Sequence, residues 1–306
     1  MPDLLVLWDV DFTLISTPGV GGQLYRIAFA EMFGGELPAL GRMAGRTDRA
    51  IALEVLTRAG IPEPRRQVAA FEAVLAARAP EVADLVRDRG TILPGAAEAI
   101  AALALAGMTE AGSAGSPGGT GGAGGTGGPG GTGATPGTGG PGGTGGTGGP
   151  GGAGSAGGVA AGDGGRSRLV VQSLLTGNIR ALAEVKLGAL GLTDHLDFAI
   201  GAYGDAHEVR SELVGPARRR ATLAYGRDFS REATVLVGDT PLDIEAALLT
   251  GARAVGVATG GFSVADLVSA GAHAVLPDLT DTGHVLSAIM DGSGAIMDGP
   301  GAAAHP

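Results

Sequence analysis

Four aspartates, Asp9, Asp11, Asp239 and Asp243, stand within a few residues of the ends of two short apolar runs. A short continuous apolar run is typical of a strand buried on both faces, and ligands of open α/β sheets bind at the carboxyl ends of such strands. We therefore expect the four carboxylates to meet. Like charges held that closely need a cation, and all-oxygen ligation suits a hard one, Mg²⁺ above all. The Asp-x-Asp spacing also lets one carboxylate attack while the other handles protons.

A third apolar run, residues 169–175, ends in Thr176-Gly177-Asn178. Its hydroxyl and backbone amides would lie at the same edge of the sheet, although the segment is far from both aspartate pairs in sequence. A lone aspartate after a strand often only caps a turn or a helix. Three strand ends that each carry polar groups indicate a site instead.

The three segments resemble three of the four motifs of the haloacid dehalogenase-like hydrolase superfamily. The chain resembles its phosphoglycolate phosphatase-type members with a helical cap, over residues 1 to about 290 apart from one insert. The resemblance implies that Asp9 is a nucleophile that forms an aspartyl-phosphate. Asp11 would protonate the leaving alcohol and then activate water. Asp9, the backbone carbonyl of Asp11 and Asp239 would hold Mg²⁺, with Asp243 supporting that site.

The same resemblance gives the phosphoryl group its partners. Thr176 and the amides of Gly177 and Asn178 would bind its oxygens, as donors aimed at developing charge. The family usually adds a lysine after the third strand, and Arg210 is our choice for that cation. Lys186 is the competitor, although we expect it to be a solvated helix residue. Arg210→Ala should then abolish turnover while Lys186→Ala retains most of it.

The expected cap carries one polar loop, in which Arg46 could reach a carboxylate or a second phosphate of the substrate. Thr47 or Asp48 serves equally well as the N-cap of a helix that begins near residue 49. Two residues depart from the family pattern: Phe12 stands where glycine is frequent, and Trp8 where phenylalanine is frequent. Neither change removes a catalytic group, and an acid at position 11 disfavours dehalogenation, in which no proton is needed by the leaving halide.

The elements that must position these residues alternate between strand and helix, which predicts a doubly wound parallel sheet of the α/β class, Rossmann-like as in the superfamily. Residues 18–89 read as helical and lack a convincing strand. Strands are expected at 4–8, 169–175, 198–202, 234–237, 254–257 and 274–276, and further helices at 94–106, 179–190, 216–225 and 244–250.

Glycine is concentrated in one segment: residues 107–165 hold 31 of the 59 glycines and only two charged side chains. We expect this insert, written mostly in Gly-Gly-X triplets, to be a flexible loop between a helix and a strand. The predicted domains are a core (1–16, 93–106 and 166–290), a helical cap (17–92), the insert and a flexible tail (291–306). Deleting residues 110–163 should leave catalysis nearly intact.

The composition of the chain excludes several kinds of chemistry and of binding partner. The chain has 306 residues, no cysteine and a formal net charge of −10. Thiolate chemistry and cysteine-bound zinc are therefore absent, and the acidic balance disfavours nucleic acid and anionic membranes as partners. No apolar run reaches 18 residues, and the N-terminal segment lacks the basic flank of a signal peptide, so we expect a cytoplasmic protein.

The combined expectation is a Mg²⁺-dependent phosphatase that hydrolyses a small phosphorylated metabolite through an aspartyl-phosphate on Asp9. Two alternatives stay open. One is a phosphomutase that uses the same aspartyl-phosphate. The other is a non-catalytic interaction protein in which the glycine-rich insert is the functional part.

Overall fold

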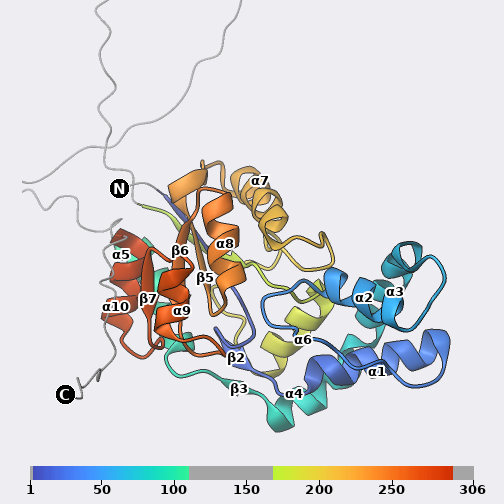
Figure 1. The fold of residues 1–306 in the computed structure, drawn as a ribbon. Coiled ribbons are helices and arrows are strands. Elements are labelled where there is room, and N and C mark those ends of the chain that lie inside the picture. The colour runs from blue at the N-terminus through green and yellow to red at the C-terminus, as the bar shows by residue number, and fades with distance from the viewer. Residues whose placement is uncertain (1–2, 110–167, 292–306) are drawn as a thin grey trace, which may run out of the picture. The chain divides into compact units, whose positions relative to one another are not determined.

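Strands and helices alternate along the chain (Figure 1), and the computed structural model describes residues 3–109 and 168–291. The strands are β1 (Leu4–Trp8), β2 (Ile15–Ser16), β3 (Thr91–Ile92), β4 (Val170–Leu174), β5 (Thr234–Gly238), β6 (Arg253–Val257) and β7 (Ala274–Leu276). The α-helices are α1 (Val20–Phe33), α2 (Asp48–Arg58), α3 (Pro64–Arg78), α4 (Ala83–Arg89), α5 (Ala96–Thr109), α6 (Arg180–Ala189), α7 (Val214–Tyr225), α8 (Pro241–Leu249), α9 (Val264–Ser269) and α10 (Thr282–Leu286). Shorter helical turns are η1 (Ala79–Val82), η2 (Arg210–Leu213), η3 (Arg231–Ala233) and η4 (Ser287–Asp291).

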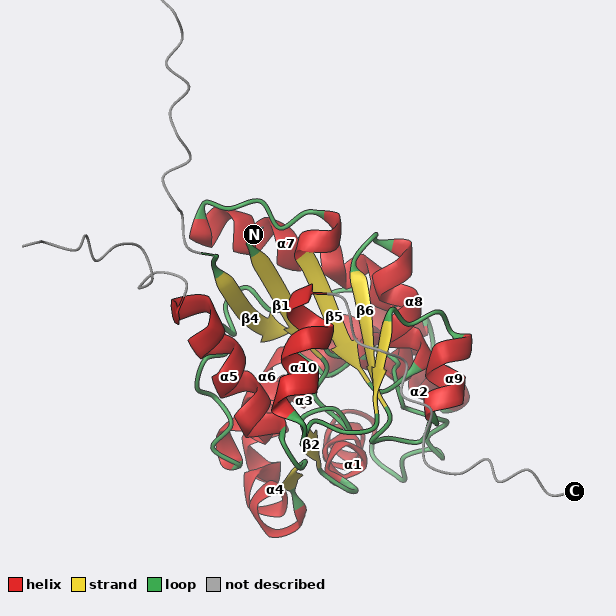
Figure 2. Cartoon of the chain, turned by 90° about the vertical axis from the view of Figure 1, so that its left-hand side faces the viewer, coloured by secondary structure: helices red, strands yellow, loops and turns green. Residues whose placement is uncertain are grey.

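Five strands form one sheet in the order β4-β1-β5-β6-β7, and every pair in it is parallel. Figure 2 shows helices on both of its faces. The doubly wound α/β fold expected from the sequence is therefore confirmed. Its strands follow the apolar runs closely, because a central parallel strand must be apolar on both sides.

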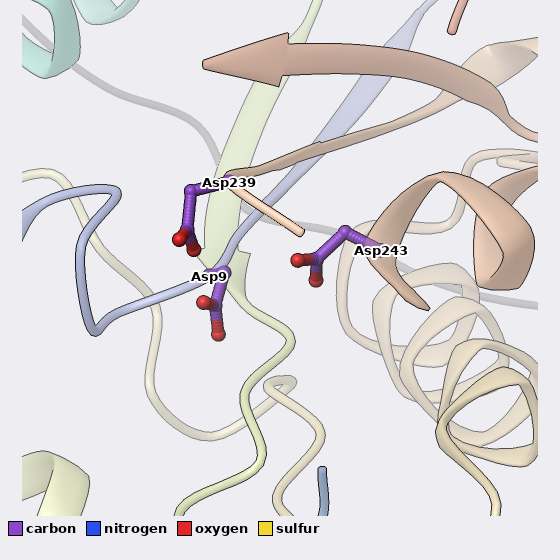
Figure 3. Close-up of side chains that lie close together, drawn as sticks. All are labelled: Asp9, Asp239 and Asp243. Atoms are coloured by element: carbon purple, nitrogen blue, oxygen red, sulfur yellow. The ribbon is translucent and has the colours of Figure 1, made fainter. Parts of the chain in front are cut away.

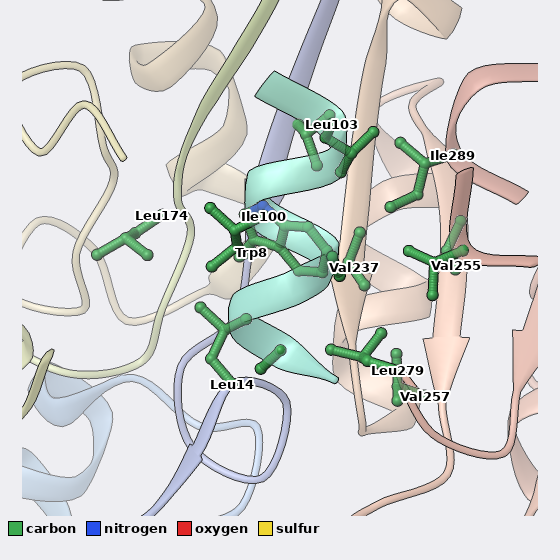
Figure 4. Close-up of a cluster of buried hydrophobic side chains, with 14 of the residues drawn as sticks. Trp8, Leu14, Ile100, Leu103, Leu174, Val237, Val255, Val257, Leu279 and Ile289 are labelled. Atoms are coloured by element: carbon green, nitrogen blue, oxygen red, sulfur yellow. The ribbon is translucent and has the colours of Figure 1, made fainter. Parts of the chain in front are cut away.

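The alternation of side chains along β1 builds two hydrophobic clusters, one on each face of the sheet. Leu4, Val6 and Trp8 enter one cluster, which α5 and α10 cover. Figure 4 shows this face around Trp8, with α5 lying across it. Leu5 and Leu7 enter the other cluster, with side chains of α7 and α8. The indole N–H of Trp8 donates to Gln172 at 3.1 Å, so Trp8 is a core residue with its polar atom satisfied.

The first four α-helices pack around a third cluster, in which the aromatic rings of Tyr25 and Phe71 meet edge to face. The sequence predicted helices here and no strand. Two very short strands nevertheless stand at the ends of this segment: β2 and β3 pair antiparallel and bring its entry and exit together. Two residues are too few to produce a periodic signal in the sequence.

The strand expected at residues 198–202 is wrong. Only Ala202 pairs, as an isolated bridge with Leu175. The reason lies at Asp197, whose side chain accepts from the backbone N–H of Ala199 at 2.9 Å and turns the chain there. The segment still reaches β4 at two points, because Asp197 donates to the carbonyl of Gln172 and Ala202 to that of Leu174.

Two other expectations, the insert and the tail, concern segments of which the structure describes only a part. The helix expected to end at residue 106 runs to Thr109, and the rest of the predicted insert (107–165) lies outside the described residues. The predicted tail begins at Asp291, the last residue of η4, and its remainder lies outside them too. Within the described part of the chain, every helix is too short or too polar to cross a membrane.

Candidate active site

A cavity of about 330 Å³ opens where three parallel strands end. Asp9 follows β1, Thr176 follows β4, and Asp239 follows β5. Because β4, β1 and β5 are neighbours, these residues share one edge of the sheet. The opposite wall comes from the helical segment. The expected site residues that line the cavity are Asp9, Asp11, Arg46, Thr176, Gly177, Asn178, Lys186, Arg210 and Asp239.

Three buried carboxylates converge beside this cavity. Figure 3 shows Asp9, Asp239 and Asp243 with their carboxyl groups turned toward one another, and one oxygen of each lies within 4.8 Å of the others. Burial first, and the neighbouring carboxylates after it, raise the pKa of Asp239 to about 8. Burial likewise raises the pKa of Asp9 to about 6, although Arg210 opposes the shift. The protein alone therefore does not neutralise this cluster fully.

Arg210 begins η2 and is buried among these acids. Its Nη2 donates to Asp9 Oδ1 at 2.6 Å and lies 2.6 Å from Asp243 Oδ1, and it also donates to the carbonyl of Leu175 at 3.0 Å. Its buried Nε has no acceptor among the described residues. Three carboxylates and one guanidinium leave a formal charge of −2. That balance and the all-oxygen donor set fit a divalent hard cation such as Mg²⁺.

Lys186 belongs to the cavity, so the expectation of a solvated helix residue is wrong. Its side chain is 4% exposed, and its Nζ donates to both carboxylate oxygens of Asp11 at 2.8 and 2.6 Å. It also donates to Asn178 Oδ1 at 2.9 Å. The cause is helical spacing: α6 buries Leu182, Ala183 and Lys186 on the same face.

The side chain of Asp11 is not part of the cluster of three carboxylates formed by Asp9, Asp239 and Asp243. Thr17 donates to its Oδ1 at 3.1 Å and Asn178 to its Oδ2 at 2.7 Å, in addition to the two bonds from Lys186. Burial acts to raise the pKa of Asp11, but Lys186 and these hydrogen bonds outweigh it, and the pKa lies below its usual value. The two aspartates of the Asp-x-Asp pair thus lie in opposite electrostatic surroundings.

Thr176 is fully buried at the end of β4. Its Oγ1 accepts from the side-chain Nδ2 of Asn178 at 2.9 Å and from the backbone N–H of the same residue at 3.3 Å. Because both bonds are accepted, the hydroxyl keeps its own proton to donate. Asn178 in turn connects Thr176 to Asp11, so the phosphoryl-binding candidates and the acid–base candidate form one network.

Two glycines in these segments are required by close packing. A Cβ on Gly177 would lie 2.0 Å from the carbonyl oxygen of Arg46, and a Cβ on Gly238 would lie 2.2 Å from Cγ of Asp243. The first allows the helical segment to approach the end of β4. The second makes room for the third carboxylate of the acid cluster.

The polar loop of the helical segment reaches the cavity through residues 45–48. Thr47 is the N-cap of α2, where it accepts from the backbone N–H of Ala50. Asp48 is buried, and its backbone N–H donates to the carbonyl of Gly177 at 2.6 Å. Arg46 lines the cavity, but its Nη1 forms an ion pair with Glu54 at 2.5 Å.

Phe12 has a left-handed backbone, with φ of 61°, and its side chain lines the cavity. This conformation costs an ordinary L-residue about 1–2 kcal/mol, and glycine adopts it freely. The departure from the family pattern at this position is therefore a strained aromatic residue at the mouth of the site. Strain retained at such a place is a mark of a functional region.

Sequence reasoning missed three features of the cavity and its network: the side chain of Thr17, the cavity-lining position of Asp48 and the burial of Lys186. A signal for Lys186 was present, because Leu182 and Leu187 mark the apolar face of α6 and a lysine within that face is unusual. Thr17 and Asp48 gave no comparable signal, since each is a common residue at a turn or a helix start.

Comparisons with known proteins agree with the fold. A family model described as HAD-hydrolase-like matches residues 211–282. No curated relative matches the sequence. A hydrolase from Pseudomonas syringae is similar in structure, with 17% identity, a TM-score of 0.53, and 94% of this chain and 99% of that chain covered.

Two other solved structures are similar to the same extent. A protein assigned as a β-phosphoglucomutase from Bacteroides vulgatus has 12% identity and a TM-score of 0.51, covering 94% of this chain and 91% of its own. A predicted phosphatase from Clostridium acetobutylicum has 11% identity and a TM-score of 0.51, covering 94% of this chain and 100% of its own. At such identities the likeness concerns the fold. The family model covers residues 211–282, and together with the motifs at three strand ends it agrees with the resemblance to the haloacid dehalogenase-like hydrolases described above.

Proposed function

We propose that the protein is a Mg²⁺-dependent phosphatase that hydrolyses a small phosphorylated metabolite through an aspartyl-phosphate on Asp9. The observation that carries this proposal is the convergence of Asp9, Asp239 and Asp243 around Arg210 at the ends of parallel strands. The match of residues 211–282 to a HAD-hydrolase-like family model and the likeness to a predicted phosphatase support the same reaction class.

In the first half-reaction, a carboxylate oxygen of Asp9 attacks phosphorus and the bond to the alcohol oxygen breaks. Arg210 holds Asp9 Oδ1 and so fixes the orientation of the nucleophile. The leaving alcohol takes its proton from the Asp11–Lys186 pair, which also lines the cavity. In the second half-reaction, Asp11 accepts a proton from water as that water attacks the aspartyl-phosphate.

Asp9, Asp239 and Asp243 would hold the Mg²⁺, with the backbone carbonyl of Asp11 as a further oxygen. When bound, the cation neutralises charge on the transferring phosphoryl group and on the carboxylates. Thr176, with the amides of Gly177 and Asn178, would donate to phosphoryl oxygens. The helical segment, residues 17–92, would act as the cap that closes the cavity over the substrate.

The test is phosphate release from a panel of metabolite phosphate esters, with Mg²⁺ and with a chelator. We expect Mg²⁺-dependent release by the wild-type protein and by Asp84→Asn, a control on exposed α4. Asp9→Asn should be inactive and should not trap a covalent phosphate. If the wild type hydrolyses no ester, and Asp9→Asn behaves identically, the proposal fails and a non-catalytic interaction protein takes its place.

A phosphomutase remains the second candidate, because one similar structure is assigned as a β-phosphoglucomutase. Both reactions share the aspartyl-phosphate and differ in whether water or a second hydroxyl receives the phosphoryl group. Incubation with a sugar monophosphate separates them: inorganic phosphate accumulates in one case, and an isomeric sugar phosphate in the other.

A further inference from the structure

The part of the cavity beyond the acid cluster is where the alcohol portion of a phosphate ester would lie. Three glycines at the start of α1 and the apolar side chains of Met43, Ile51 and Leu182 line it, so most of this wall offers no polar side chain. Three charged side chains interrupt the apolar surface: Arg46, Asp48 and Lys186. The ion pairs and hydrogen bonds that each of these side chains already forms determine which alcohols the wall accepts.

Both cations of this wall are already committed. Lys186 donates to the carboxylate of Asp11 and to the amide oxygen of Asn178. Arg46 is ion-paired with Glu54, and its guanidinium also donates to the backbone carbonyl of Arg42. The remaining cation of the cavity, Arg210, lies between Asp9 and Asp243. Among the described lining residues, each cation therefore has a carboxylate partner.

Unlike these cations, the carboxylate of Asp48 forms no ion pair with any described residue. Asp48 is 4% exposed, and the hydrogen-bond donors to its carboxylate among the described residues are both neutral. The hydroxyl of Tyr25 donates to Oδ1 at 3.1 Å, and the backbone N–H of Ile179 donates to Oδ2 at 2.8 Å. A carboxylate oxygen can accept two hydrogen bonds, so each oxygen keeps capacity for one more donor. Lys186 acts on this carboxylate only through space, without a hydrogen bond to it, and a buried carboxylate in that position favours a donor and opposes another anion.

We propose that this wall selects phosphate esters whose alcohol portion presents a hydrogen-bond donor, a hydroxyl or an ammonium group, to Asp48. Esters that carry a carboxylate there are rejected, because no uncommitted cation of the wall would receive it. This inference rests on the proposed phosphatase function and names its substrate class. It departs from the phosphoglycolate phosphatase type that the sequence motifs resemble.

The volume limits the alcohol further. About 330 Å³ is at the lower end of the range for small-molecule sites, and the phosphoryl group takes part of it. The substrate is therefore the ester of a short alcohol, with its donor only a few bonds from phosphorus.

The first experiment compares four esters of similar length with the wild-type protein and Mg²⁺. They are O-phosphoethanolamine and glycerol 3-phosphate as donor-bearing esters, 2-phosphoglycolate as the acid, and ethyl phosphate as the apolar reference. We expect kcat/KM of the donor-bearing esters to exceed that of 2-phosphoglycolate at least tenfold. Equal or greater kcat/KM for 2-phosphoglycolate would overturn the inference while leaving the phosphatase intact. Failure to release phosphate from any ester would overturn the proposed function itself.

The second experiment uses Asp48→Asn, which is isosteric and can keep both local bonds. The amide oxygen can accept from Ile179, and the amide nitrogen can donate to the Tyr25 hydroxyl, which has a second acceptor in the carbonyl of Asp48 at 3.0 Å. We expect the preference for O-phosphoethanolamine over 2-phosphoglycolate to fall about tenfold, mainly through KM. Asp84→Asn removes the same charge from an exposed helix position and should keep the wild-type preference. An unchanged preference in a folded Asp48→Asn protein would contradict the assignment.

Discussion

The two buried cations of the cavity contact different carboxylates. Arg210 contacts Asp9 and Asp243, whereas Lys186 contacts Asp11. The nucleophile candidate and the acid–base candidate therefore each have a cation of their own. Choosing between the two cations, as the sequence alone suggested, is unnecessary because they serve different carboxylates.

This division changes one expected result. Arg210→Ala should still abolish turnover, but Lys186→Ala should now lower kcat about 100-fold or more, because it leaves Asp11 without its partner. Steady-state phosphate release measures both variants. Arg180→Ala, on an exposed face of the same helix where Arg180 pairs with Glu184, is the matched control and should keep wild-type kcat. A Lys186→Ala protein with more than half of the wild-type kcat would restore the original expectation.

The raised pKa values of the acid cluster couple metal binding to pH. With a pKa of about 8, Asp239 is largely protonated at pH 7, and Asp9, at about 6, is protonated in part. Their charged forms are the metal ligands, so Mg²⁺ binding should release protons and tighten as pH rises from 6 to 8. Calorimetric titration at pH 7 in two buffers of different ionisation enthalpy measures that release. A heat independent of the buffer would contradict it.

The same shifts have a consequence for the metal-free protein. A carboxyl group whose pKa is raised by folding stabilises the fold at low pH, and this contribution is lost as pH rises through the folded pKa. The free energy of unfolding without metal should therefore decline between pH 6 and 8, and the decline should be smaller in Asp239→Asn. Urea titrations at these two pH values compare the variants.

At the scale of elements, the loop at residues 45–48 and the end of β4 fit together through a glycine. A side chain on Gly177 would collide with the carbonyl of Arg46. Gly177→Ala should therefore lower activity at least tenfold by displacing this loop. Gly188→Ala, in α6, is the control: a Cβ there meets nothing within 4 Å, and alanine in a helix should stabilise the protein by about 1 kcal/mol. Equal activity of the two variants would show that the loop contact is dispensable.

Elements with strong periodicity could be predicted from the sequence, and elements governed by single contacts could not. Strand β1 could be predicted from its apolar run alone, because a strand that is buried on both faces must be apolar along its whole length. The turn at Asp197 replaced an expected strand through one side-chain hydrogen bond. The site followed the same rule. Its acids could be found from their positions after strands, whereas the partnership of Lys186 with Asp11 depends on how α6 packs, which the sequence shows only faintly.

At the scale of the whole molecule, the described flanks of the insert lie side by side. A Cβ on Gly107, in α5, would lie 3.2 Å from Cβ of Val170, the first residue of β4. The catalytic candidates stand at the other end of this strand, beyond Leu174. Deletion of residues 110–163 should therefore keep kcat/KM within about threefold of wild type, and stability should not fall, since a shorter loop costs less to close. Thermal unfolding and phosphate release test this. A folded deletion variant with little activity would show that the insert contributes to the reaction.

Other parts of the chain gather at this same amino edge of the sheet. The backbone N–H of Leu169 donates to the side chain of Asp3, and Arg168 donates to the carbonyl of Met290. The first and last described residues therefore lie close to the flanks of the insert, one strand length, roughly 15 Å, from the catalytic edge. A tether attached at this pole would hold the protein with its cavity directed away from the support. Immobilised copies would then keep the catalytic edge of the sheet away from the support, whether the anchor stood beside Asp3 or beside Met290.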